Sequence, residues 1–386
     1  MLLHSAVWWK AQLLSNGICI DNSVIHNYNS KFIEKRSAYG IQDPAEYQLC
    51  RIPQELFILP EEVVCAVNIK KESDYILYYS ETDETYWVAG QTLQDKVQVS
   101  FPLRPDFYSK SLILSNPLKV NQVITLYGGH SLGAFLVRNC WIEKNGVCHF
   151  CSLCNNHGSQ NDFLNIIDDD SLIESLRIAI SENYPITQIM INGGNLADLD
   201  INFDFYVSKI IKIRKMLDDY RRADIELHLI VSPPKSLSLI EKLNSLDIKI
   251  AMNIETYDNA FFSRYCPGKD RYIGHKHIFD ALNKCVSVLG EERVYTIFVG
   301  GLEPINSLHN GLVCMRDNGI VPVINVLHID PNTFMREEQR PSPEFILKAG
   351  SLLQNIYSTY SEKFTPFYYK CGRNSIDAEA YLKMFN

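Results

Sequence analysis

The stretch QIMINGG at residues 188–194 decides the fold of this chain. An apolar run of strand length ends here in two adjacent glycines, and a longer stretch of helical spacing follows. The same alternation recurs from about residue 120 onward. It predicts strands at 134–139, 188–192, 226–231, 249–255, 294–299 and 321–329, and helices at 170–183, 205–221, 236–246, 272–289, 305–318 and 343–358.

Continuous apolar strands that alternate with helices indicate a parallel sheet, either an open doubly wound one or a partial barrel. In both architectures the chemistry belongs at the C-terminal ends of the strands. Residues 1–115 differ, because short alternating runs such as 63–69 and 75–79 are broken by polar turns. This pattern predicts a mixed or mostly β extension, whose role the sequence does not reveal.

Composition excludes several classes of protein. The chain has 386 residues, of which 46 % are hydrophobic and 21 % charged, as in ordinary globular proteins. A net charge of −8 without a dense basic run argues against non-specific nucleic-acid binding. Because no apolar stretch of about 18 residues and no signal-peptide pattern is found, we expect a cytoplasmic protein without a membrane span. The oligomeric state is not predicted.

Cysteines are crowded in one place. Four of the eleven, Cys140, Cys148, Cys151 and Cys154, lie within fifteen residues directly after the first predicted strand. In a chain that is not secreted, such crowding favours metal or redox chemistry over disulfides. Three thiolates, from Cys140, Cys148 and Cys151, can hold three irons of a [4Fe–4S] cluster and leave the fourth iron open.

Other interpretations of these cysteines stay open. Cys154 could replace Cys140 as the third cluster ligand. A zinc site could form from Cys148, Cys151, Cys154 and His157, although zinc modules usually carry two ligand pairs separated by a longer loop. The thiols could also be buried and bind nothing.

The run Cys148-His149-Phe150-Cys151 resembles the cluster loop of radical S-adenosylmethionine (SAM) enzymes, with a first gap of seven residues where three are usual. Asn192-Gly193-Gly194-Asn195 resembles the Gly-Gly-Glu-Pro motif of that superfamily, with Asn195 in place of the acidic residue. Asn253-Ile254-Glu255-Thr256 resembles a sequence of the biotin-synthase-like and lipoyl-synthase-like branches. The resemblance implies a partial (β/α)6 TIM-type barrel over residues 116–358.

This resemblance implies a set of residues that bind SAM at the strand ends. Backbone carbonyls at the glycine pair would accept from the ammonium group of SAM, and Glu255 would bind a ligand hydroxyl or ammonium. Each position also has a structural interpretation, such as a tight turn, an Arg-paired carboxylate or a solvated loop charge. The candidates are Gly193, Gly194, Asn195, Ser232, Asn253, Glu255, Arg271, Gly300 and His328.

The activity implied by the resemblance is reductive cleavage of SAM to a 5′-deoxyadenosyl radical, which abstracts hydrogen from a small-molecule substrate. A flavodoxin or ferredoxin would supply the electron. No catalytic side chain is assigned, and we expect a single cluster because Cys266, Cys285, Cys314 and Cys371 have no close cysteine neighbours in sequence. A zinc-stabilised binding protein and a degenerate partner subunit are the alternatives. The aromatic and basic tail, 359–386, could close the open side of the barrel.

Overall fold

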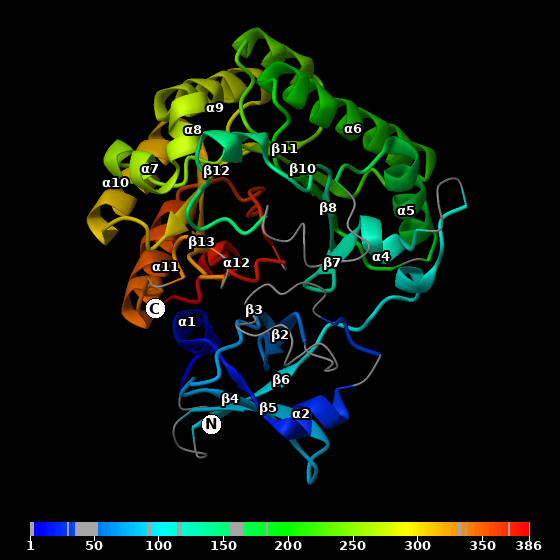
Figure 1. Ribbon diagram of the computed structural model, residues 1–386, viewed down its shortest axis with the longest axis vertical. Coiled ribbons are helices and arrows are strands. Elements are labelled where there is room, and N and C mark those ends of the chain that lie inside the picture. The colour runs from blue at the N-terminus through cyan, green and yellow to red at the C-terminus, as the bar shows by residue number, and fades with distance from the viewer. Residues whose placement is uncertain are drawn as a thin grey trace.

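The computed structural model describes residues 4–28, 31–34, 53–90, 95–113, 118–153, 165–182, 184–330, 333–336, 338–369 and 371–385. These residues form two sheets, one from the N-terminal third of the chain and one from the remainder (Figure 1). Among the described residues no helix is both long and apolar enough to cross a membrane.

The first sheet contains six strands in the spatial order β1 (Cys19–Ile20), β4 (Ile76–Ser80), β5 (Thr85–Ala89), β6 (Lys96–Ser100), β2 (Glu55–Ile58) and β3 (Val63–Ala66). Every pairing is antiparallel except that of β1 with β4. Two helices, α1 (Ala6–Asn16) and α2 (Asn22–Asn27), accompany it. The sheet is therefore mixed. Its strands come from the alternating runs of the sequence, since successive side chains of a strand point to opposite faces.

The second sheet contains seven strands whose spatial order follows the sequence. β7 (Thr125–Tyr127) is antiparallel to β8, and the other pairs are parallel. The parallel strands are β8 (Ser131–Phe135), β9 (Gln188–Asn192), β10 (Glu226–Ile230), β11 (Lys249–Ala251), β12 (Val294–Gly300) and β13 (Val321–Val326). The expected α/β class is therefore confirmed, in the form of a curled half-barrel sheet.

Helices cover the convex side of this sheet (Figure 1). They are α5 (Asp169–Ser181), α6 (Leu199–Asp219), α7 (Asn259–Tyr265), α8 (Pro267–Tyr272), α9 (His275–Leu289), α10 (Ile305–Asp317) and α11 (Pro343–Tyr357). Short elements are the 3-10 helices η1 (Asp106–Ser109), η2 (Trp141–Asn145) and η4 (Leu237–Leu243), and the helices α4 (Val120–Val123) and α12 (Asp377–Tyr381). Aspartate side chains begin α5 and α6, since Asp168 and Asp198 accept from backbone N–H groups of the first turns.

Several boundaries differ from the sequence prediction, for local reasons. The strand predicted to end at Glu255 ends at Ala251, because the Thr296 hydroxyl accepts from the Ile254 N–H at 3.1 Å and donates to the Met252 carbonyl at 2.8 Å. The Thr296 side chain thus replaces backbone–backbone hydrogen bonds between β11 and β12. The helix predicted at 236–246 is the 3-10 helix η4, and Gly274, at φ +88°, separates α8 from α9.

The C-terminal tail contacts both the edge strand β13 and the first residue of β9. Ser375 pairs with Asn325 of β13, and the Val326 N–H donates to the Asn374 carbonyl at 2.8 Å. Cys371 accepts from the Gln188 side chain, at the first residue of β9, at 3.2 Å. Thr365 and Cys371 of the tail therefore lie at the N-terminal strand ends, opposite to the end that carries the cysteine loop, whereas Asn374 and Ser375 pair along the edge strand β13.

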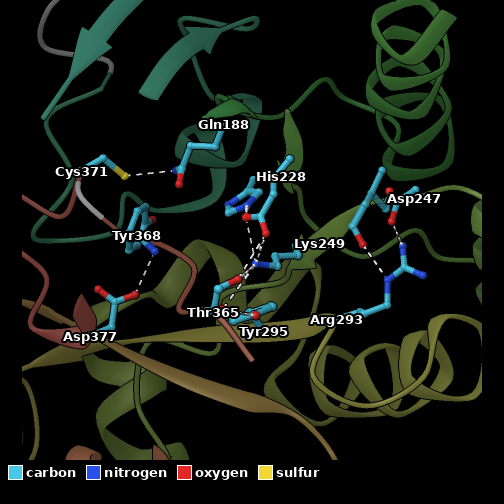
Figure 2. A network of polar contacts seen from close by, with 12 residues as sticks. Gln188, His228, Asp247, Lys249, Arg293, Tyr295, Thr365, Tyr368, Cys371 and Asp377 are labelled. Carbon is cyan, nitrogen blue, oxygen red and sulfur yellow. Dashed lines mark hydrogen bonds and ion pairs between the residues drawn. The ribbon is translucent and has the colours of Figure 1, made fainter. Parts of the chain in front are cut away.

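A polar network fixes the tail at these N-terminal ends (Figure 2). Lys249, the first residue of β11, donates to Glu226 of β10 at 2.9 Å and also contacts Thr365. His228 is fully buried beside the Phe367 ring and contacts Glu226 at 3.0 Å. Burial lowers the pKa of His228, so this imidazole is neutral near pH 7.

Candidate functional site

The glycine turn after β9 lets two backbone segments approach closely. The Gly194 N–H donates to the Val137 carbonyl at 2.7 Å. A Cβ on Gly194 would lie 1.7 Å from the Asn139 carbonyl oxygen, and one on Gly193, whose φ is +152°, would lie 2.7 Å from the Val137 carbonyl oxygen. Because no side chain fits there, both glycines hold the segment that leads from β8 into the cysteine loop.

Cys140 is held by the same turn. The Asn195 amide donates to the Cys140 sulfur at 3.5 Å, and the Trp141 N–H donates to the Asn195 carbonyl at 2.8 Å. The Asn195 side chain is itself oriented by a 3.3 Å hydrogen bond from Asn202 of α6. The structure thus places Asn195, which departs from the acidic residue of the resembled motif, against the first cysteine.

Cys148 and Cys151 follow η2 and lie near Cys140. The Cys151 N–H donates to the Cys148 carbonyl at 3.0 Å, which folds the loop back on itself. The Cys151 sulfur interacts electrostatically with the sulfurs of both Cys148 and Cys140. Three thiols on one loop at the C-terminal strand ends are donors of the type that iron–sulfur clusters use.

The described residues contain no group of three or more His, Cys, Asp or Glu side chains placed to hold a metal ion together. Cys154 and His157, on which the zinc interpretation and the alternative third cluster ligand depend, lie outside the described residues.

Glu255 is paired with a lysine that the sequence argument did not select. The Lys269 ammonium donates to the Glu255 carboxylate at 2.7 Å and to the Asn253 carbonyl at 2.6 Å. Burial opposes the charge of Lys269, yet Glu255, Cys148 and Cys266 raise the pKa of Lys269 above its usual value. A buried cation therefore lies beside both the strand end and the cysteine loop.

The backbone at this strand end is strained. Glu255 has a φ of +66°, a conformation that a residue with a side chain seldom adopts. Two hydrogen bonds to β12 hold it, from the Glu255 N–H to the Ile297 carbonyl and from the Val299 N–H to the Glu255 carbonyl. The Asn253 side-chain oxygen is buried and has no hydrogen-bond partner among the described residues. Both positions suit ligand binding, since strain and unsatisfied polar atoms concentrate at such sites.

The remaining predicted residues are spread along the same end of the sheet. Ser232 is half-buried after β10, and Gly300 ends β12, where its carbonyl accepts from the Leu327 N–H at 2.9 Å. His328 is half-buried after β13, and its Nε2 lies 3.9 Å from the Asp330 carboxylate. Arg271 is exposed on α8, because residues two apart in a helix do not share a face with the inward Lys269.

Asp330 and Ser152 are polar residues that the sequence argument missed. The Ser152 hydroxyl donates to the buried Asp330 carboxylate at 2.7 Å, which ties the end of the cysteine loop to the last strand. Val299, Leu302, Leu327 and Met335 form a small apolar cluster against which Phe150 packs. A polar residue directly after a predicted strand was the available signal for Asp330.

No family model matches the chain. A curated relative, the bacteriochlorophyllide c C-7(1)-hydroxylase of Chlorobaculum limnaeum, is 26 % identical over 165 residues. These residues cover 39 % of this chain and 40 % of the relative, so the match spans less than half of either protein.

Two solved structures are similar to parts of this chain at low sequence identity. A radical SAM methyltransferase from Sphaerobacter thermophilus is 12 % identical with a TM-score of 0.46, over 79 % of this chain and 82 % of the other. The FeFe-hydrogenase maturase HydG from Carboxydothermus hydrogenoformans is 15 % identical with a TM-score of 0.43, over 62 % and 54 %.

The sequence motifs and the hydroxylase, which is a radical SAM enzyme, point to the same superfamily. The cysteine loop, the glycine pair and the Asn-Ile-Glu-Thr run stand in the order of the superfamily, and the structure has them at one end of one sheet. These findings support assignment of the chain to the radical SAM superfamily.

Proposed function

We propose that this chain binds a [4Fe–4S] cluster through Cys140, Cys148 and Cys151 and uses it with SAM to abstract hydrogen from a small molecule. The observation that carries the proposal is that neighbouring residues hold the cysteine loop at the C-terminal strand ends. Asn195 contacts Cys140, and Lys269 lies near Cys148. When bound, such a cluster supplies one electron that cleaves SAM and so provides a 5′-deoxyadenosyl radical.

The chain's own residues would position the cysteine loop, bind and orient the ligand, and keep water out of the site. Gly193 and Gly194 keep the loop close to the strand ends, so that Cys140 stays in one position. Lys269 holds the Glu255 carboxylate in place, and the free side-chain oxygen of Asn253 is an acceptor for a ligand ammonium or hydroxyl. Phe150 and the apolar cluster of Val299, Leu302, Leu327 and Met335 keep water from the same end of the sheet.

The relative supports a carbon–hydrogen bond as the point of attack, since its name describes hydroxylation at a ring substituent of bacteriochlorophyllide c. We extend to this chain only the class of reaction and propose a small organic molecule as substrate, with a low-potential flavodoxin or ferredoxin as electron donor. We also propose that residues 116–358 form a partial (β/α)6 barrel, with the SAM site at the C-terminal ends of β9 to β13.

Anaerobic reconstitution tests the proposal. Wild-type protein should take up about four irons with a reducible cluster spectrum, and then form 5′-deoxyadenosine from SAM. A variant with Cys140, Cys148 and Cys151 all changed to Ala should take up none. Cys285→Ala, which removes a buried thiol from α9, is the matched control and should retain its iron. Iron retained by the triple variant would contradict the proposal.

A further inference from the structure

The cysteine loop runs alongside the α7–α8 junction in the opposite direction. The His149 N–H donates to the Tyr265 carbonyl at 2.8 Å. Farther along, a Cβ on Gly268 would lie only 2.0 Å from the Gly146 carbonyl oxygen. With 149 beside 265 and 146 beside 268, Cys148 and Cys266 stand directly opposite each other. This pairing rests on backbone contacts on both sides of the two cysteines.

The two side chains meet across this pairing. The Cys148 thiol is hydrogen-bonded to the Cys266 thiol, and Cys266 itself is fully buried between α7 and α8. A disulfide joins Cβ atoms about 3.5–4.5 Å apart, and thiols that already share a hydrogen bond are close to this separation. A small movement of the loop therefore suffices to join the sulfurs.

We propose that Cys266 is the redox partner of Cys148, and that the two thiols form a reversible disulfide in the cluster-free chain. The two thiols lose two electrons and two protons, and a sulfur–sulfur bond forms. A small-molecule disulfide such as oxidised glutathione accepts both electrons and protons, and its own sulfur–sulfur bond is broken to give two thiols.

The disulfide would control cluster assembly, a consequence that rests on the function proposed above. It occupies one of the three cluster ligands, because Cys148 cannot bind iron while it is bonded to Cys266. Cysteine residues bound to a cluster are in turn protected from oxidation, since their sulfurs are coordinated. The pair thus links the redox state of the surroundings to the capacity of the chain to accept iron.

Linkage mapping tests the pair without any iron. The full cluster-free chain is incubated with oxidised glutathione, digested under non-reducing conditions and analysed by peptide mass spectrometry. We expect a peptide that joins Cys148 to Cys266, which dithiothreitol removes. The linked peptide should be absent from the Cys266→Ala variant. If circular dichroism shows that this variant does not fold, Cys266→Ser replaces it in the experiment. Cys285→Ala, equally buried on α9, should keep it. Preferential linkage of Cys148 to Cys140 or Cys151, or a Cys266 that stays reduced, would overturn the pairing.

Iron uptake tests the consequence. Oxidised wild-type protein should take up iron and sulfide only after dithiothreitol treatment, whereas reduced wild-type and reduced Cys266→Ala protein should do so directly. If the linked peptide forms but oxidised protein assembles a full cluster, control by this disulfide is refuted. If reduced wild-type protein binds no cluster at all, the proposed function fails while the linkage map still decides the pairing.

Discussion

Lys269 neutralises Glu255 where almost no water reaches, since the two side chains are 11 % and 9 % exposed. Lys269→Met would leave the carboxylate buried without its cation and should destabilise the fold by about 3–5 kcal/mol. Urea unfolding of the cluster-free chain measures this. Lys276→Met breaks an exposed pair with Asp280 on α9 and should change stability by less than about 0.5 kcal/mol. Equal effects of the two variants would show that the Lys269 pair contributes little.

At the scale of elements, the cysteine loop is locked against α8 by two glycines. Gly268→Ala would push its Cβ into the Gly146 carbonyl, a backbone group that cannot rotate away. We expect a loss of about 1–3 kcal/mol or more in unfolding free energy, and faster proteolysis within residues 141–149. Gly90→Ala is the control, because the nearest contact of its Cβ would be the movable Asp95 carboxylate, at 3.3 Å. Unchanged proteolysis of Gly268→Ala would contradict this role of the glycines.

At the scale of the whole molecule, Glu55 joins both sheets and the tail. This residue of β2 accepts from the Gly128 N–H at 2.6 Å, after β7, and its carboxylate lies 3.5 Å from Arg373 of the tail. Burial raises the pKa of Glu55 from 4.5 to about 7, although Arg373 and the Gly128 hydrogen bond oppose the shift. The folded chain therefore binds this proton more tightly than the unfolded chain does.

The sign of the pH dependence follows from this shift. Stability from Glu55 is fully present below pH 4.5 and is lost as the pH rises to about 7, a change of up to about 3 kcal/mol. Glu55→Gln should remove this contribution, so that the stability difference between the variant and wild type changes between pH 4.5 and 7.5 in urea unfolding. Glu61→Gln, on an exposed turn of the same sheet, should leave that difference constant. A constant difference for Glu55→Gln would show that the carboxyl has no raised pKa.

Much of the larger sheet was predictable from sequence, because buried parallel strands are continuous apolar runs and the helices between them have their own period. Gln188–Asn192 was predicted to the residue. Glu255 illustrates the limit, since the hydroxyl of Thr296 on a neighbouring strand ended β11 early. Side-chain bonds of this kind depend on which strands are neighbours, which local patterns do not contain. The roles of the predicted SAM-binding residues stay predictions.

The sequence by itself determined the α/β class, the alternation of strands and helices, and the crowding of Cys140, Cys148 and Cys151 after a strand, because these are local patterns of apolar and thiol side chains. Only the tertiary structure decided that Cys266 faces Cys148, that Lys269 pairs with Glu255, and that part of the tail lies at the N-terminal strand ends. Those contacts join residues far apart in the chain. Their partners are chosen by the packing of β11, α7 and α8 against the cysteine loop, which exists only once the sheet has curled.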